Sequence, residues 1–148
     1  MIISSFEEYK SYLGLQIGQS GWHKINQQQT TGFSDSTDRY ISNEGNGEKQ
    51  APVDSGFVPG YLTLSLIPYL WKQIADIRDV KMEVNYGIEN FMFNQAVRVD
   101  DQVMLRAKLI SISDLRGITK VVIQADLDIK GATITAYTGN VVFLYHFN

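Results

Sequence analysis

Hydrophobic residues are densest in the segment PGYLTLSLIPYLWKQIADI, residues 59–77. One face of a helix through this segment carries apolar residues at helical spacing: Leu62, Leu66, Trp71 and Ile74. Further apolar residues extend around the same helix: Leu64, Ile67 and Leu70. The pattern predicts one long helix, roughly Gly60 to Ile77, which must be covered on most of its sides. Pro68 should bend it, because proline lacks an amide hydrogen.

After residue 80 the apolar period changes to two, which is typical of strands. Four strands are predicted, at residues 80–93, 102–113, 117–129 and 132–147. The turn sequences VDDQ, DLRG and IKGA separate these four strands from one another. Gly87 and Gly139 interrupt two of the strands and predict bulges, since glycine inside a strand often marks one.

Three shorter elements are predicted before the long helix. The stretch SFEEYKSYLG has Ser5 as a helix cap, Leu13 on its apolar face and Gly14 as its stop. The stretch GWHKINQ alternates as a short strand, and QQQTTGFSDSTD predicts a short polar helix that ends near Ser36. Turn-forming residues dominate positions 42–55, which predicts a long loop.

The order of these elements predicts an α+β fold. No repeat or linker divides the chain, so residues 1–148 are expected to form a single domain. One long apolar helix precedes an antiparallel meander of strands. The simplest packing is a strongly curved sheet wrapped around that helix, because each element buries its apolar face against the other.

Composition and charge narrow the classes of function. The net charge is −3 and the basic residues are scattered, so nucleic acid is not expected as a partner. The absence of cysteine excludes disulfides and thiolate catalysis. No apolar run could span a bilayer and no signal-peptide pattern opens the chain, so we expect a cytoplasmic protein without a membrane partner. The acidic pairs and the two histidines lack the context of a metal site, and none is expected.

Several motifs carry a resemblance to a known family. GYLTLSLIP at residues 60–68, NYG at 85–87 and the following VRV segment resemble the MaoC-like dehydratases, nearest the nodulation protein N-type branch. WHKINQQQTTGFSDSTD also resembles the stretch that precedes the family's active site. The resemblance covers the chain from about Ile17 to the C-terminus. It implies the hot-dog fold, a curved antiparallel sheet around one central helix.

The resemblance also implies chemistry on acyl thioesters. Family members add water to, or remove it from, thioesters of coenzyme A or of an acyl carrier, using an Asp and a His in one loop. Asp38 matches the family's Asp, whereas Ser42 stands where the His is expected. A second family histidine, before the helix glycine, is Pro59 here. A backbone N–H at the helix start, near Gly60, would bind the thioester carbonyl, whose oxygen gains negative charge during the reaction.

The candidate site residues follow from these matches. The catalytic candidates are Asp38 and Ser42. The candidates for substrate binding are Tyr40, Pro59, Gly60, Tyr61, Asn85 and Tyr86. Each has a structural alternative: Asp and Ser are common turn residues, a glycine can simply start a helix, and NYG can be a strand bend. His23 is expected to be structural. No cofactor is expected beyond the coenzyme A or acyl-carrier thioester of the substrate.

Two functions remain open from the sequence. The first is an acyl-thioester hydratase or dehydratase with a degenerate Asp/His loop. The second is a non-catalytic or repurposed hot-dog protein that binds or shapes a thioester-linked or biosynthetic intermediate. Under both, we expect residues 33–55 to form the rim of a pocket whose wall is the helix. A homodimer is also expected: an antiparallel sheet has edge strands that need cover, and the resemblance implies that two hot-dog sheets join edge to edge.

Overall fold

The computed structural model describes residues 1–38 and 56–148 of the chain. The predicted loop 42–55 lies outside the described residues. The helices are α1 (Phe6–Lys10), α2 (Gln27–Ser36), α3 (Gly60–Ser65) and α4 (Ile67–Ile74). The strands are β1 (Ile2–Ile3), β2 (Gln16–Gln19), β3 (His23–Lys24), β4 (Asp76–Ile77), β5 (Val80–Phe93), β6 (Gln102–Asp114), β7 (Thr119–Ile129) and β8 (Tyr137–Phe147).

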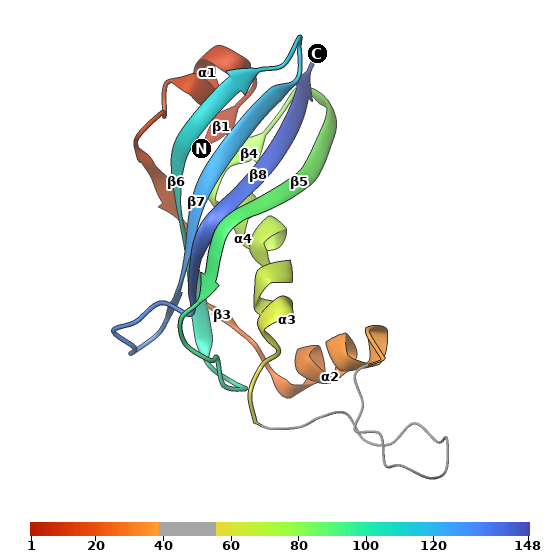
Figure 1. The fold of residues 1–148 in the computed structure, drawn as a ribbon, viewed down its shortest axis with the longest axis vertical. Helices are drawn as coiled ribbons and strands as arrows, with labels where there is room; N and C mark the ends of the chain where they lie inside the picture. The colour runs from red at the N-terminus through yellow and green to blue at the C-terminus, as the bar shows by residue number, and fades with distance from the viewer. Residues whose placement is uncertain (39–55) are drawn as a thin grey trace.

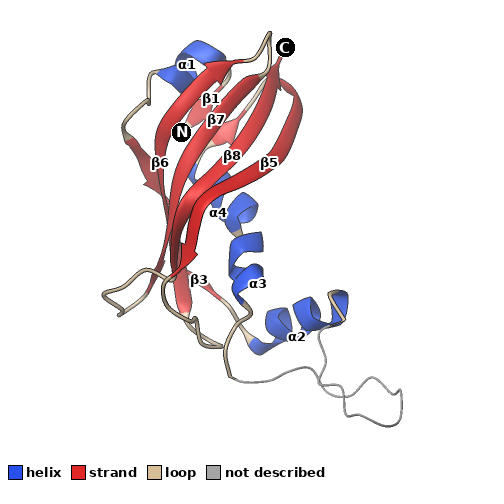
Figure 2. Ribbon diagram, in the orientation of Figure 1, coloured by secondary structure: helices blue, strands red, loops and turns tan. Residues whose placement is uncertain are grey.

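A curved antiparallel sheet dominates the molecule (Figures 1 and 2). Its strand order is β2-β6-β7-β8-β5, and β3 also pairs with β6. The long strands do not form a simple meander, because β5 lies beside β8 at the far edge rather than beside β6. Residues 94–101 connect β5 to β6, and eight extended residues are long enough to pass under the two strands between them. The predicted α+β fold with a curved antiparallel sheet is confirmed.

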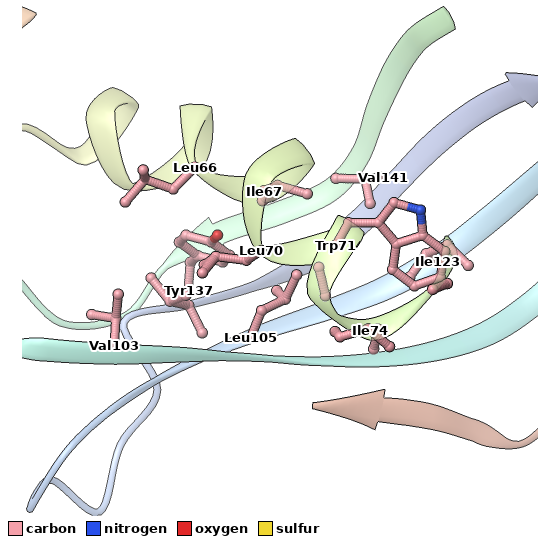
Figure 3. Packing of buried hydrophobic residues seen from close by; sticks show 14 of the residues in the cluster. Leu66, Ile67, Leu70, Trp71, Ile74, Val103, Leu105, Ile123, Tyr137 and Val141 are labelled. Carbon is pink, nitrogen blue, oxygen red and sulfur yellow. The ribbon is translucent and has the colours of Figure 1, made fainter. Parts of the chain in front are cut away.

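The core lies between the sheet and the helices α3 and α4, which run along one face of it (Figure 1). Figure 3 shows the side chains of Leu66, Leu70 and Ile74 directed toward the strands. Two buried hydrogen bonds tie the helices to β8. Trp71 Nε1 donates to the Tyr145 hydroxyl at 3.2 Å, and the Tyr137 hydroxyl donates to the Thr63 carbonyl at 3.3 Å. These bonds fix the position of the helices along the sheet.

The predicted single helix from Gly60 to Ile77 is wrong in two respects. It is divided into α3 and α4 at Leu66, and it ends at Ile74 because Ala75 is extended and leads into β4. Pro68 accounts for the division, since it has no N–H to donate to the carbonyl four residues earlier. Leu66 keeps a helical conformation and Leu70 N donates to its carbonyl at 3.0 Å, so the two helices follow one another closely.

The expectation that the helix is covered on most sides is also wrong within one chain. Tyr61 is 69% exposed and Tyr69 is 54% exposed, and Leu64 and Pro68 are half-buried. Only one side of α3 and α4 packs on the described sheet. The outer side therefore presents apolar surface to its surroundings.

Two local predictions need correction. The first helix ends at Lys10 rather than near Gly14, and Leu13 is 47% exposed. Gly139 does not form a bulge itself; the register shift lies opposite it, in β5 between Glu89 and Met92. A Cβ at residue 139 would collide with the ring of Phe91 and lie 2.8 Å from its Cα, so the close approach of β5 requires glycine there.

Other local predictions are confirmed. Ser5 caps the first helix by accepting a hydrogen bond from Glu8 N. The polar helix ends at Ser36, the strand at residues 80–93 has its predicted bounds, and a register shift occurs beside Gly87. The last strand begins at Tyr137, five residues later than predicted. Residues 132–136 instead continue the turn after Gly131, whose φ is +82°.

Candidate functional site

A cavity of about 640 Å³ opens at the start of α3. Three elements meet there: the end of α2, the start of α3 and the end of β5. The lining residues are Phe33, Thr37, Pro59, Gly60, Tyr61 and Phe93. Most of these side chains are apolar or aromatic. The cavity can therefore hold an apolar group next to the backbone of a helix start.

A chain of side-chain contacts positions α2 at this cavity. The Asn26 side chain caps the helix by accepting from Gln29 N at 2.9 Å. The Gln29 side-chain oxygen lies 3.1 Å from His23 Nε2, and the His23 ring meets Tyr69 edge-on with centroids 5.4 Å apart. His23 thus links α2 to β3 and α4. This contact supports the structural role that the sequence assigned to it.

The start of α3 presents backbone N–H groups to the cavity. Pro59 is the N-cap and its side chain cannot accept a hydrogen bond. Leu62 N and Thr63 N donate to the Pro59 carbonyl, at 3.0 and 3.4 Å. The N–H groups of Gly60 and Tyr61 make no hydrogen bond with residues 1–38 or 56–148. Both amides are therefore available to an oxygen atom, and the positive end of the helix dipole favours one that carries negative charge.

The ring of Phe93 leaves little space for a side chain at position 60. A Cβ there would lie 3.0 Å from Cε1 and 3.1 Å from Cζ of Phe93. The ring thus packs directly against the backbone of residue 60. A bulkier residue would have to displace it.

A buried tyrosine on β8 is hydrogen-bonded to the first turn of α3. The Tyr137 hydroxyl donates to the carbonyl of Thr63, whose own hydroxyl donates to the Gly60 carbonyl at 2.6 Å. Burial raises the pKa of Tyr137 above its ordinary value, so the hydroxyl keeps its proton and continues to donate. This arrangement holds the first turn of α3 in place.

Asp38 is next to a cavity-lining residue in the sequence. It directly follows Thr37, which lines the cavity and ends α2 as its C-cap. Asp38 is exposed and has a left-handed backbone, with φ of +53°, which Asp adopts more readily than most residues. The backbone of Asp38 therefore fits the structural alternative, in which this residue forms the turn that ends α2. Its catalytic role stays a prediction.

The remaining candidates are distributed unevenly. Pro59, Gly60 and Tyr61 come together at the cavity, as predicted. Asn85 and Tyr86 instead line a different cavity of about 410 Å³, between the β5 edge and the junction of α3 and α4. Tyr40 and Ser42 lie outside the described residues.

Three lining residues were not named as individual candidates from the sequence: Phe33, Thr37 and Phe93. Phe33 and Thr37 belong to the stretch 33–55 that was expected to form the rim, whereas Phe93 was not expected at the site. Phe33 was one residue of a polar helix, and Phe93 was the last residue of a strand. Their meeting depends on where α2 and β5 end in space, and no spacing in the sequence indicates it. The described residues contain no group of three or more side chains suited to holding a metal ion, and no helix long and apolar enough to cross a membrane.

Comparisons with known proteins agree with the motifs. The chain is 26% identical over 135 residues to 3-hydroxyacyl-thioester dehydratase Z of Mycobacterium tuberculosis, covering 89% of each protein. It is 26% identical over 152 residues to nodulation protein N of Rhizobium meliloti, covering 97% of this chain and 92% of that protein. No family model matches the chain.

A solved structure shares the fold. The MaoC-like dehydratase of Rhodospirillum rubrum aligns with a TM-score of 0.65 and 12% identity, over 92% of this chain and 93% of that one. This likeness confirms the predicted hot-dog fold. Together with the curated relatives, it confirms the predicted likeness to MaoC-like proteins near nodulation protein N.

Proposed function

We propose that this protein is a hydratase or dehydratase-like protein that acts on acyl thioesters. The observation that carries the proposal is a pair of amides, Gly60 N–H and Tyr61 N–H, that have no hydrogen-bond partner among residues 1–38 and 56–148 and lie at the mouth of an apolar cavity in a MaoC-like fold. The similarity to a 3-hydroxyacyl-thioester dehydratase supports the same substrate class. The thioester is carried by coenzyme A or by an acyl carrier protein, and the chain needs no other cofactor.

The chemistry assigns a separate role to each part of the site. In the hydration direction, the thioester oxygen accepts hydrogen bonds from the two amides of α3. The Asp38 carboxylate takes a proton from water, and the hydroxide oxygen bonds to C3 of the enoyl group. The electron pair of the double bond moves to form an enolate, whose negative oxygen the amides stabilise. The protonated Asp38 carboxyl then returns its proton to C2, which completes the addition of one water molecule, and dehydration is the reverse.

The alternative function remains a repurposed protein that binds a thioester-linked intermediate without water chemistry. Two observations favour it: Ser42 replaces the loop histidine of the family and Pro59 replaces the second one. Losing one member of an acid–base pair typically lowers the rate by about a hundredfold to ten-thousandfold. We therefore expect weak turnover of ordinary enoyl-CoA.

A hydration assay with crotonyl-CoA and longer enoyl-CoA substrates separates the two functions. Loss of enoyl absorbance is measured beside the shift in melting temperature that each thioester induces. Binding with slow hydration is the expected result, and binding without any hydration favours the alternative. Turnover of about ten per second would show that the histidine is dispensable. If the protein neither binds nor hydrates any of these thioesters, the thioester assignment is refuted.

A glycine pair tests where the thioester binds. Gly60→Val places side-chain atoms against Phe93 and should abolish the thermal shift. Gly32→Val is the matched control, because nothing lies within 4 Å of a Cβ at that position of α2. Equal thermal shifts in both variants would place the site elsewhere.

We also infer a homodimer formed along β5. Among the described strands, β5 pairs with β8 alone, so its other edge offers unpaired backbone groups. Its large side chains are exposed: Met82, Tyr86, Ile88 and Met92. A second copy of the chain would cover this edge together with the outer side of α3 and α4. Light scattering at micromolar concentration should give the mass of a dimer, and a monomer mass would contradict the inference.

A further inference from the structure

A second cavity lies beside the first at the start of α3. Its volume is about 290 Å³. It is lined by residues of α3, of the segment before it and of the connection after β5: Val58, Gly60, Thr63, Phe93, Asn94, Gln95, Ala96 and Val97. Gly60 and Phe93 are the two residues that line both cavities. The ring of Phe93 therefore stands between two spaces that both reach the backbone of Gly60.

The ring is held in this position from several sides. Its edge meets Gly60, and its centroid lies 5.0 Å from that of Phe91 and 6.2 Å from that of Tyr137, both in edge-to-face geometry. The Tyr61 ring lies on a further side, with centroids 6.1 Å apart. Even so, Phe93 is 44% exposed, because two cavities adjoin it. The packing makes the ring a fixed wall, while its exposure allows it to contact a ligand.

The two cavities differ in chemistry. The larger one has three aromatic side chains, from Phe33, Tyr61 and Phe93. The smaller one is lined by Asn94 and Gln95 beside apolar residues, and the Asn94 side-chain nitrogen donates to the Thr135 hydroxyl at 3.0 Å. A thioester bound through its carbonyl oxygen extends two arms from the carbonyl carbon, an apolar acyl group and a pantetheine arm with two amide groups. The aromatic cavity matches the first arm, and the cavity with the two polar residues matches the second.

We propose that Phe93 is a specificity-determining residue that separates the acyl arm from the pantetheine arm and limits the size of the acyl group. The inference rests on the proposed thioester function. The acyl group occupies the aromatic cavity, and the Phe93 ring is the wall against which it ends. Removing the ring joins the two spaces, so bulkier acyl groups should fit.

Calorimetric titration with saturated acyl-CoA esters tests this wall, because these compounds bind without being hydrated. Butanoyl-CoA and a bulky partner, phenylacetyl-CoA, are titrated into the wild type, Phe93→Ala and Met92→Ala. In Phe93→Ala, the affinity ratio of phenylacetyl-CoA to butanoyl-CoA should rise about tenfold or more, the scale on which apolar pockets discriminate size. Met92→Ala is the matched control, since this neighbouring side chain is 67% exposed and lines neither cavity, and its ratio should not change.

A second pair of variants links the effect to the contact with Gly60. Gly60→Ala puts a Cβ 3.0 Å from the ring and should weaken butanoyl-CoA binding severalfold in the wild-type background. In the Phe93→Ala background the same methyl group has room, so the loss should be smaller. Phe93→Leu keeps part of the wall, so its affinity ratio of phenylacetyl-CoA to butanoyl-CoA should lie between those of the wild type and Phe93→Ala. This variant tests the inference if Phe93→Ala does not fold.

The outcomes separate this inference from the proposed function. An unchanged ratio in Phe93→Ala and Phe93→Leu, in a protein that binds and hydrates thioesters, overturns the wall and leaves the function in place. A shifted ratio in a protein that hydrates no enoyl-CoA supports the wall and overturns the catalytic assignment. Absence of acyl-CoA binding in the wild type overturns both.

Discussion

The centre of the sheet and its β5 edge are built from similar residues but bury them differently. On β7, the inward side chains from Val121 to Ile129 are at most 6% exposed. On β5, the large hydrophobic side chains Met82, Tyr86, Ile88 and Met92 are 40% to 67% exposed. Strand β7 has a neighbour on each side, whereas β5 pairs with β8 alone in the described structure.

This difference in burial assigns different roles to the two regions: the centre of the sheet stabilises the fold, and the exposed end carries the candidate site. Side chains at the centre pack against the helices and remove apolar surface from water, which stabilises the fold. The edge, the start of α3 and the end of α2 instead carry exposed aromatics, two cavities and amides without a partner in the described part of the chain. Substitutions in the centre should therefore reduce stability, and substitutions at this end should reduce binding or activity.

The largest expected effect is on stability at the centre. Leu127→Ala removes a fully buried side chain and should lower the free energy of unfolding by about 2–5 kcal/mol, because a cavity remains. Ile88→Ala on β5 removes a side chain that is 49% exposed in the single chain, so it should change the free energy of unfolding of the monomer by less than about 1 kcal/mol. Denaturant unfolding of both variants, at concentrations low enough to keep the protein monomeric, measures the contrast. At concentrations where the inferred dimer forms, the loss in Ile88→Ala should grow; equal losses in the two monomers would contradict the comparison.

Next in size is a loss of activity without a loss of stability. Asp38→Ala should lower the hydration rate by about a hundredfold, because the water would lose its base. Its melting temperature should stay within a few degrees of the wild type, since the side chain is exposed. Asp35→Ala, at another exposed position near the end of α2, is the control and should retain activity. Similar rates for the two variants would remove Asp38 from the mechanism.

A pair of glycine substitutions sharpens the comparison further. Gly139→Ala on β8 collides with Phe91 and should destabilise the protein by about 1–3 kcal/mol, as overpacking does. Gly87→Ala on β5 meets nothing within 4 Å and should be close to neutral. Thermal unfolding of both variants measures the difference. A neutral Gly139→Ala would show that β5 can move away from β8 at that point.

The smallest effect is a gradual loss of stability at high pH. Burial raises the pKa of Tyr137 and Tyr145 above the value of about 10 in unfolded chains. At pH values between the unfolded and folded pKa, the folded state binds more protons, so stability is complete below pH 10 and falls as the pH rises above it. Unfolding curves between pH 9 and about 11 should show this decline. Tyr137→Phe should make it shallower, whereas Tyr61→Phe, at an exposed position, should leave it unchanged.

Local order in the sequence accounts for the predictions that succeeded. The strand at 80–93 was bounded correctly because it lies between turn-forming residues and contains a glycine at the register shift. Gly60 and Pro59 were identified through the resemblance to MaoC-like proteins, and the N–H donors expected at a helix start supported that assignment. The caps at Ser5 and the end of α2 near Ser36 follow from the same local rules.

The failures at the sheet edge and at the cavity share one physical cause, which is dependence on contacts distant in sequence. The position of β5 beside β8 follows from the path of residues 94–101, and the alternating pattern is the same for either neighbour. The exposure of β5 follows from that position at the edge. Phe33 and Phe93 meet at Gly60 because α2 and β5 both end there, although 60 residues separate them along the chain (93 − 33).

The sequence by itself determined the type of each long element, the period of two in the strands, and the likeness to MaoC-like proteins. These properties depend on periodicity and on motifs, which are local and therefore readable along the chain. The tertiary structure alone decided which strand lies at the edge, which apolar side chains stay exposed, and that Phe93 stands between two cavities at Gly60. Those properties depend on which segments, far apart in the sequence, pack against one another, and a local residue pattern is the same whichever segment becomes the neighbour.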